Sequence, residues 1–369
     1  MNIPMFDLNR KLYRFENQIQ DAFKTVLQSG NLILGNQVQD FETEFAQFLG
    51  VEFCIGVGNG TDALEIALKS LQLKKNSTVL TVANAGGYAT TSIINSALNP
   101  RYVEIDYKSG NTNLEYCMQT DLTNVSAVVL THLFGNPVED TEEIIKFFNS
   151  KGIQTIEDCS QSSGARYKSK FVGTFSDVSC FSFYPTKNLG CIGDGGAVVT
   201  NNSELAKRIK MLRTYGWSQK YEVEIGFGRN SRLDEIQAAC LRVFLPKLES
   251  DNVCRAKIAQ RYQKEISVDG VVIGSISPKS ESAYHLFVLI TPYRNELVRH
   301  LRELGVSSAI HYPIPDMLQP GFKSPQENLP NTENFSNHVL SIPIFPEMRK
   351  EEIDHVITAI NCFSSSELK

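Results

Sequence analysis

Apolar, β-branched runs alternate with helix-periodic segments through the first two thirds of this chain. Five runs predict buried strands, at 77–84, 101–106, 126–134, 152–158 and 180–184. Three segments with apolar residues at helical spacing predict helices, at 61–71, 139–150 and 203–216. This alternation predicts an α/β fold with a mostly parallel central sheet flanked by helices. Such sheets bind their ligands at the carboxyl ends of the strands.

A long helical pattern follows over residues 233–266, with Pro246 inside it. Proline has no amide hydrogen to give to a helix, so we expect a kink or a break there. Beyond this helix the pattern restarts as a compact α+β unit. We therefore expect a large α/β domain over residues 1–245 and a small C-terminal α+β domain over residues 246–369. The last residues, 363–369, are expected to fray.

Composition narrows the class of protein. The 369 residues are 42% apolar and 21% charged, which is typical of a globular protein. A net charge of −5 gives no basic surface for nucleic acid. The sequence shows no apolar run of transmembrane length and no signal peptide, so we expect a cytoplasmic protein. The eight cysteines form no CxxC pair, which argues against a metal site and favours reduced, buried thiols.

The run GNGTDAL, from Gly58 to Leu64, places glycines and a threonine where a strand gives way to a helix. Exposed amides at a helix N-terminus bind anions, and glycine lets a ligand approach the backbone closely. The run is therefore a candidate phosphate cradle formed by Gly60 and Thr61, although an ordinary capped helix would have the same pattern. It is not a G-x-G-x-x-G fingerprint, so it gives little support to a dinucleotide site.

Two further candidate groups follow later strands. Asp158 ends the strand predicted at 152–158, and Lys187 lies in FSFYPTKNLG among aromatic residues, which disfavour a charged amine. Pyridoxal 5'-phosphate (PLP) needs a lysine for a Schiff base, an anion for its pyridinium nitrogen and donors for its phosphate. Lys187, Asp158 and Ser182 could supply all three, and Gln161 could bind the ring hydroxyl. The alternatives are a solvated surface lysine and an acid that only caps the next turn.

Other reactive residue types give weaker patterns. His132, His285 and His311 are each flanked by apolar residues, and a lone histidine in such surroundings is more often a core group than a catalyst. Cys159 lies beside Asp158 and is interpreted as a packing residue. No Ser-His-Asp or Cys-His set can be assembled from sequence context.

Seven motifs together resemble the DegT-type nucleotide-sugar aminotransferases, which are fold-type I, aspartate-aminotransferase-like PLP enzymes. The motifs are GNGTDAL (58–64), HLFGN (132–136), EDCSQSSGARY (157–167), SFYPTKNLG (182–190), DGGAVVT (194–200), GRNSRLDEIQAA (228–239) and HYPIP (311–315). They occur in the family's order, and the resemblance runs over practically the whole chain. It implies a transaminase that uses L-glutamate, dTDP- or UDP-linked keto sugars and a pyridoxamine phosphate intermediate, and that serves cell-surface polysaccharide or antibiotic sugar synthesis.

The resemblance also implies roles for individual residues. Lys187 would bond to the cofactor and then move the proton, Asp158 would hold the pyridine nitrogen, and Gln161 the ring hydroxyl. Gly60, Thr61 and Ser182 would hold the phosphate. Asn230 would reach the cofactor phosphate of a neighbouring subunit, which implies a homodimer with shared active sites. The segments 217–230 and 311–321 are expected to contact the sugar and the nucleotide. In the second segment, His311 and Tyr312 are the expected substrate-binding residues.

One stretch departs from the family pattern. Many relatives carry an aromatic residue in T-F/Y/W-x-A-T that covers the cofactor ring, and in this register Gly87 stands at its position. Tyr88 could replace that aromatic residue after a small backbone shift, which Gly86 and Gly87 would permit.

Three alternatives to the aminotransferase remain. PLP-dependent sugar dehydratases of the family carry histidine in place of the lysine, so Lys187 argues against them. A PLP-binding regulator would have no reason to keep both Lys187 and Gln161, and a dehydrogenase would show a true G-x-G-x-x-G. A C4 ketone is slightly preferred over C3, only because C4 is where the common sugar-nucleotide dehydratase leaves a ketone.

Overall fold

The structure, a computed structural model, describes residues 1–322 and 327–364. Within these residues the central sheet has seven strands in the order β1-β9-β8-β5-β4-β2-β3. Their bounds are β1 Phe53–Val57, β2 Thr78–Thr81, β3 Asn99–Tyr102, β4 Val125–Thr131, β5 Gln154–Asp158, β8 Val178–Ser182 and β9 Gly196–Thr200. The predicted strands are all present, and most are shorter than predicted.

The direction of the strands confirms the predicted fold class. Neighbours from β3 through β8 pair in parallel, whereas β9 runs antiparallel to both β8 and β1. The register sets Thr131, the last residue of β4, opposite Asp158, the last residue of β5. The polar side chains that follow these strands therefore meet at one edge of the sheet.

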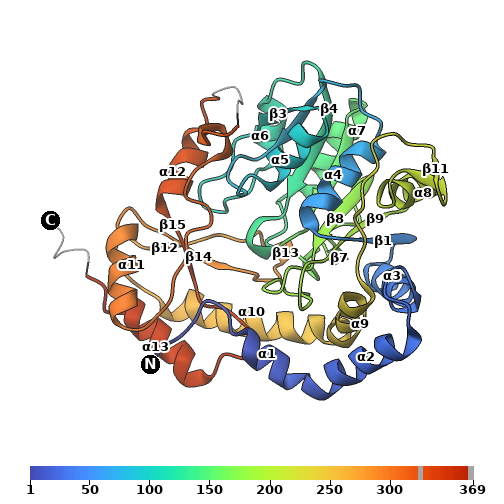
Figure 1. Cartoon of the computed structure of the whole chain (residues 1–369). Coiled ribbons are helices and arrows are strands. Elements are labelled where there is room, and N and C mark those ends of the chain that lie inside the picture. The colour runs from blue at the N-terminus through green and yellow to red at the C-terminus, as the bar shows by residue number, and fades with distance from the viewer. Residues whose placement is uncertain (323–326, 365–369) are drawn as a thin grey trace.

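Helices cover both faces of this sheet (Figure 1). Along β9, Val198 packs with the apolar side chains of α4 and α8 on one face, while Ala197 and Val199 pack with those of α3 and α9 on the other. Strands buried on both faces explain why the sequence shows continuous apolar runs there. The helices of this part are α1 Leu8–Arg14, α2 Glu16–Ser29, α3 Asn36–Leu49, α4 Gly60–Ser70, α5 Tyr88–Asn95, α6 Leu114–Gln119, α7 Thr141–Ser150, α8 Ser203–Leu212 and α9 Glu235–Phe244.

The predicted break at Pro246 is confirmed. A 3₁₀ turn, η2 Leu245–Lys247, separates α9 from the long helix α10 Leu248–Glu265. By contrast, the helix predicted over 203–216 ends at Leu212. Tyr215 and Gly216 have φ of 60° and 77°, which a right-handed helix cannot continue through.

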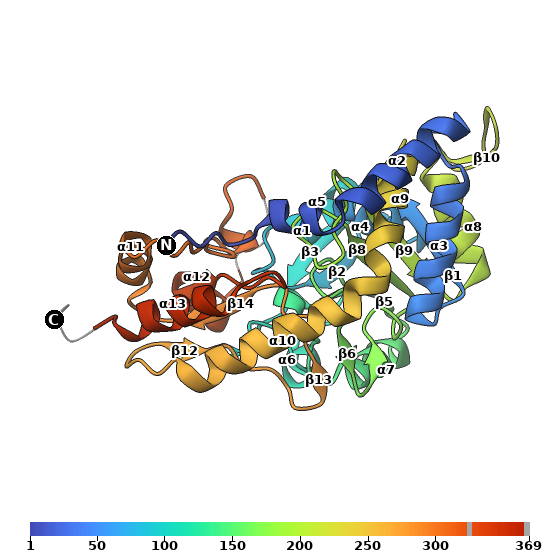
Figure 2. The same cartoon turned by 90° about the horizontal axis from the view of Figure 1, so that it is seen from below.

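The C-terminal elements gather at one end of the molecule, joined to the sheet by α10 (Figures 1 and 2). The N-terminus lies with them, because Ile3 forms a bridge with Val306 and Arg10 binds Glu352. The first residues of the chain therefore pack on the C-terminal unit. The predicted domain boundary at residue 245 stays a prediction. The elements are β12 Val272–Ile273, β13 Ser280–Glu281, β14 Phe287–Ile290, β15 Val339–Ile342, α11 Arg294–Glu303, η3 Asp316–Leu318, α12 Pro330–His338 and α13 Lys350–Asn361.

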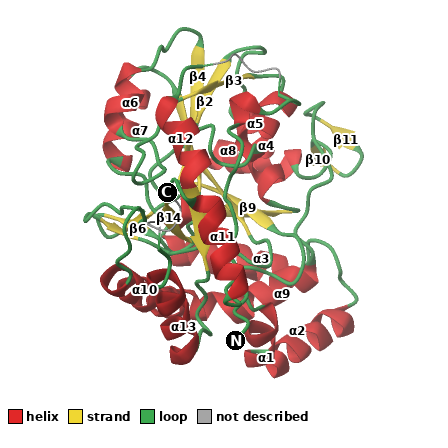
Figure 3. Ribbon diagram, turned by 90° about the vertical axis from the view of Figure 1, so that its left-hand side faces the viewer, coloured by secondary structure: helices red, strands yellow, loops and turns green. Residues whose placement is uncertain are grey.

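The remaining strands are short. They are β6 Arg166–Tyr167, β7 Lys170–Phe171, β10 Trp217–Gln219 and β11 Glu222–Val223, and a 3₁₀ turn, η1 Leu133–Gly135, follows β4. The β10–β11 hairpin projects from the periphery of the molecule (Figure 3). Among the described helices, none is both long and apolar enough to span a membrane. Of the predicted frayed end, residues 365–369 lie outside the described residues.

Candidate active site

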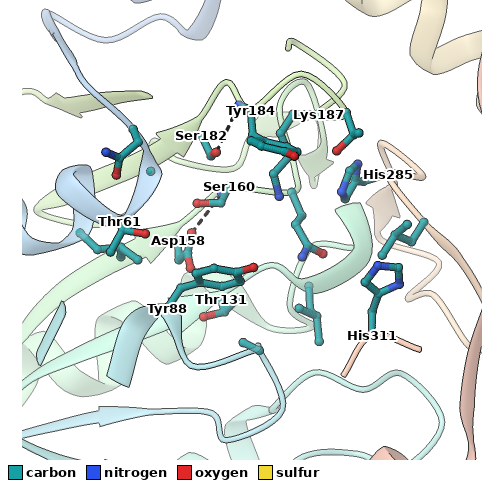
Figure 4. A pocket seen from close by; sticks show the side chains of 18 of the residues that line it. Thr61, Tyr88, Thr131, Asp158, Ser160, Ser182, Tyr184, Lys187, His285 and His311 are labelled. Atoms are coloured by element: carbon teal, nitrogen blue, oxygen red, sulfur yellow. Dashed lines mark hydrogen bonds between the residues drawn. The ribbon is translucent and has the colours of Figure 1, made fainter. Parts of the chain in front are cut away.

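A pocket of about 600 Å³ lies at the carboxyl ends of the parallel strands, where the fold class predicts a ligand. It brings together nine predicted site residues: Gly60, Thr61, Tyr88, Asp158, Gln161, Ser182, Lys187, His311 and Tyr312. Figure 4 shows Thr61 and Ser182 at one side of the pocket and His285 and His311 at the other. Asp158, Tyr88 and Lys187 lie between these two sides.

The side of the pocket at α4 is where the sequence predicts an anion cradle. Asn59 caps the helix, because its Oδ1 accepts a hydrogen bond from the Asp62 amide at 2.8 Å. A Cβ added to Gly60 would lie 2.6 Å from Ser182 Cβ, so only glycine fits between the helix and β8. The helix start and the Ser182 hydroxyl can therefore both reach one bound anion.

Lys187 stands in the loop after β8, which is held at both of its ends. The Lys187 amide donates to Tyr184 O at 2.8 Å, and the Cys191 amide donates to Phe183 O at 2.9 Å. Burial lowers the pKa of Lys187 to about 8, although Asp158 opposes this shift. The amine is therefore much more often neutral than a surface lysine, as a nucleophile and proton carrier must be.

Asp158 and Thr131 end neighbouring strands. Asp158 is 6% exposed, and its Oδ1 accepts a hydrogen bond from the Ser160 amide at 3.0 Å. Thr131 Oγ1 is buried and has no hydrogen-bond partner among the described residues. A buried polar atom without a partner inside a pocket indicates that a ligand completes its hydrogen bonding.

Gln161 is held by two contacts that the sequence did not indicate. Its Oε1 accepts from the Phe134 amide at 2.7 Å, and its Nε2 donates to the Tyr312 hydroxyl at 3.1 Å. The amide is thus oriented by the backbone after β4 and joined to the segment that carries His311 and Tyr312. Its role toward the cofactor ring hydroxyl stays a prediction.

The three histidines differ in their surroundings. His132 is fully buried, with Nε2 3.0 Å from Glu157 Oε1 and Nδ1 accepting from the Val138 amide at 3.0 Å, as a core group would be. His285 and His311 instead line the pocket. Burial lowers the pKa of both, that of His311 to about 4, and the charge of Lys187 adds to the effect. Both imidazoles are therefore neutral at physiological pH.

Asn230 does not line the pocket of its own chain. It lies exposed after the β10–β11 hairpin, in an isolated bridge with Thr214. Its predicted role, in the active site of a partner subunit, is compatible with this outward position and stays a prediction.

The lining residues that were not predicted include Phe6, Thr131, Ser160, Tyr184, Asp194 and His285. Thr131, Ser160, Tyr184 and Asp194 stand next to or inside motifs that the sequence singled out, so these motifs were the available signal. Phe6 and His285 come from distant parts of the chain, and no local pattern connects either of them to the pocket.

The residues present fit PLP. The glycine-lined helix start and Ser182 match a phosphate, Asp158 matches a protonated pyridine nitrogen, and Lys187 is the amine that such a cofactor requires. The unpartnered Thr131 Oγ1 leaves a polar contact for a ligand in the same space. Tyr88 lines the pocket with 52% of its surface exposed, and its predicted role in covering the cofactor ring stays a prediction.

Comparisons with known proteins identify the family. The profile of the DegT/DnrJ/EryC1/StrS aminotransferase family matches residues 14–361. The chain is 37% identical over 360 residues to the dTDP-3-amino-3,6-dideoxy-alpha-D-galactopyranose transaminase of Aneurinibacillus thermoaerophilus, covering 97% of this chain and 99% of the relative. It is 36% identical over 364 residues to the dTDP-3-amino-3,4,6-trideoxy-alpha-D-glucose transaminase of Streptomyces venezuelae, covering 97% and 95%.

A solved structure agrees with these relatives. The crystal structure of S. venezuelae DesV in complex with a ketimine intermediate has a TM-score of 0.95 at 35% identity, over 98% of both chains. Dependence on PLP follows from membership of an aminotransferase family. The predictions of the fold and of the enzyme class are therefore both confirmed. This chain belongs to the DegT/DnrJ/EryC1/StrS aminotransferase family.

Proposed function

We propose that this enzyme transfers the amino group of L-glutamate to the C3 ketone of a dTDP-linked deoxy sugar, using PLP. The observation that carries the proposal is a single pocket that holds Lys187, with its lowered pKa, beside Asp158 and a glycine-lined anion cradle. A sugar nucleotide and glutamate would use this pocket in turn.

The side chains divide the work by their chemistry. Bound PLP would supply an electron sink for the carbon that loses its proton. Asp158 would keep the pyridine nitrogen protonated, and Gly60, Thr61 and Ser182 would hold the phosphate. The amine of Lys187 would take the proton from the donor carbon and return it two atoms away, to the carbon on the other side of the amino nitrogen.

Two neutral imidazoles favour a sugar over a second anion at the far side of the pocket. His285 and His311 have lowered pKa values because of burial and of Lys187, so they offer hydrogen bonds without charge. Neutral donors and acceptors suit hydroxyl and carbonyl groups. The relatives from Aneurinibacillus and Streptomyces venezuelae are both named for dTDP-3-amino sugars, and this favours C3 over C4 for the ketone.

We propose in addition that two copies share their active sites. Exposed apolar side chains cluster in sequence in two regions. Tyr13 and Leu27 lie on α1 and α2, with Leu32 and Ile33 in the loop after α2; Tyr221 and Val223 lie in the β10–β11 hairpin, with Phe227 just after it. Exposed apolar groups in such number mark an interaction surface. A partner seated there would bring Asn230 to a second pocket.

Lys187 decides against the alternatives. A dehydratase of this family would lack the lysine, and a regulator would have no use for an amine whose pKa is lowered to about 8. We keep neither as a second candidate.

Product analysis tests the proposal. Purified enzyme with PLP and L-glutamate should aminate a dTDP-3-keto-6-deoxyhexose, with the new amine at C3 by NMR, and should leave the 4-keto isomer largely unchanged. Lys187→Ala should abolish turnover, while Lys170→Ala, which removes an exposed lysine, should not. Preferential amination of the 4-keto isomer would refute the C3 assignment, and turnover by Lys187→Ala would refute the role of the lysine.

A further inference from the structure

The segment 311–322 crosses the start of α5, and Asp316 fastens it there. The Asp316 amide donates to Ala83 O at 2.7 Å, and the Thr90 hydroxyl donates to Asp316 Oδ2 at 2.5 Å. Asp316 is 1% exposed, and its Oδ1 has no hydrogen-bond partner within the described part of the chain. Both the backbone and the side chain of this residue thus join the segment to the large sheet region.

Two glycines make this approach possible. Gly86 and Gly87 have φ of 82° and 81°, which other residues rarely adopt. A Cβ on Gly86 would lie 2.8 Å from the Tyr312 ring, and one on Gly87 would lie 3.1 Å from the Phe322 ring. The aromatic side chains of the segment therefore occupy the space that side chains at positions 86 and 87 would need.

The fastened pieces each contribute to the pocket. Tyr88 is the first residue of α5, and its ring lies 6.2 Å from that of Tyr312 in an edge-on arrangement. Tyr312 accepts a hydrogen bond from Gln161, and His311 Nδ1 lies 2.9 Å from Ser341 Oγ. A movement of the segment would therefore displace Tyr312 and His311 together, and would remove a neighbour of Tyr88.

We propose that Asp316 is a positioning residue: through Thr90 and Ala83 it holds segment 311–322 against α5, and so sets His311, Tyr312 and Tyr88 for the sugar substrate. Gly86 and Gly87 contribute to the same contact, because the Tyr312 and Phe322 rings of the segment pack against them. Asp316 itself does not line the pocket.

We expect this contact to respond to pH. Burial raises the pKa of Asp316 to about 7, while the hydrogen bond from Thr90 and the nearby Gly87 amide oppose the rise. Other titratable groups lie near the Asp316 carboxyl. Its own segment carries His311 and Tyr312, and the neighbouring elements carry Tyr88 on α5 and Tyr102 on β3. Glu327 accepts a hydrogen bond from the Tyr102 amide and lies near Arg101. Because the docked carboxyl prefers its proton, docking weakens as pH rises from the ordinary value of 3.8 to about 7, and stays constant above that.

Hydrogen–deuterium exchange of the cofactor-free protein tests the contact directly. At pH 5.5 and 8, after correction for intrinsic rates, segments 83–90 and 311–322 should exchange at least about tenfold faster at pH 8. Asp316→Asn is isosteric with the protonated acid, so it should remove this difference and keep the slower rate. Thr90→Val should speed exchange at both pH values. Glu327→Gln, which neutralises a second carboxyl of raised pKa at the Tyr102 amide, should leave both segments unchanged.

Steady-state kinetics form a second arm, which rests on the proposed function. The KM for the sugar nucleotide should rise with pH in the wild type and stay flat in Asp316→Asn, with kcat changing less than KM. Asp316→Ala should raise KM about tenfold at both pH values. Exchange that is equal in wild type and Asp316→Asn at every pH would overturn the proposal, whatever the substrate proves to be. Inactivity toward the sugar with the expected exchange pattern would instead refute the proposed function alone.

Discussion

The most informative perturbation of the site is Asp158→Asn, read out on Lys187 in the cofactor-free enzyme. Burial lowers the pKa of Lys187 to about 8, and Asp158 raises it. With the carboxylate replaced by a neutral amide, only the effect of burial remains. The pKa of Lys187 should therefore fall further, below 8.

The size of the existing shift makes the effect measurable. With a pKa of about 8, about a quarter of the Lys187 amines are neutral at pH 7.5, against about one in a thousand for a lysine at the ordinary 10.5. Only the neutral amine can attack an acylating reagent. Lys187 should therefore react some hundredfold faster at this pH than an equally accessible surface lysine.

The assay follows acylation of the Lys187 peptide by mass spectrometry between pH 6 and 10. The midpoint of the rate gives the pKa, and the exposed Lys170 in the same protein serves as an internal reference. Asp194→Asn is the matched control, because Asp194 lines the same pocket and does not contribute to the pKa shift of Lys187. It should leave the midpoint near 8.

Two results would refute this reasoning. A midpoint near that of Lys170 would mean that the loop after β8 leaves Lys187 solvated. An unchanged midpoint in Asp158→Asn, or an equal fall in Asp194→Asn, would mean that Asp158 is not the charge that the amine senses.

Two further variants test the cradle and the joint between the termini. Gly60→Ala brings a methyl to 2.6 Å from Ser182 Cβ, so it should weaken PLP binding at least about tenfold in an absorbance titration and cost roughly 1–3 kcal/mol of stability; unchanged PLP affinity would remove α4 from the phosphate site. The hydrogen-bonded Arg10 lowers the pKa of the buried Glu352 to about 2, so Glu352→Gln should lower the free energy of unfolding by on the order of 3 kcal/mol at pH 7. That difference should shrink as pH falls from about 4.5 toward 2, and denaturant unfolding that shows no pH dependence would contradict it.

Local patterns predicted the fold well because buried parallel strands are apolar throughout. Strands β2, β3, β4, β5 and β8, the helix after Gly60 and the break at Pro246 all followed from periodicity and from proline chemistry. The end of α8 at Leu212 was missed, because the positive φ at Tyr215 depends on backbone contacts with the distant residue Arg229. Periodicity carries no information about such contacts.

The candidate site was predictable where its residues follow strands. Asp158, Ser182 and Lys187 lie in one stretch of chain, and the sheet brings them together. The contacts of Gln161 with Tyr312, and of Thr90 with Asp316, join segments more than 150 residues apart in sequence. No single-sequence pattern could indicate them. The Gly86-Gly87 pair was interpreted only as permitting a backbone shift at Tyr88, and the packing of Tyr312 and Phe322 against it was not predicted.

The absorption spectrum of the purified enzyme with PLP, recorded before and after L-glutamate is added, tests the central claim most directly. The account predicts a visible band of lysine-bound PLP that fades with glutamate and returns when a dTDP-3-keto sugar is added. A protein that binds PLP and ignores glutamate would contradict the assigned amino donor. A protein that shows no band at all would contradict the pairing of Lys187 and Asp158 on which the account depends.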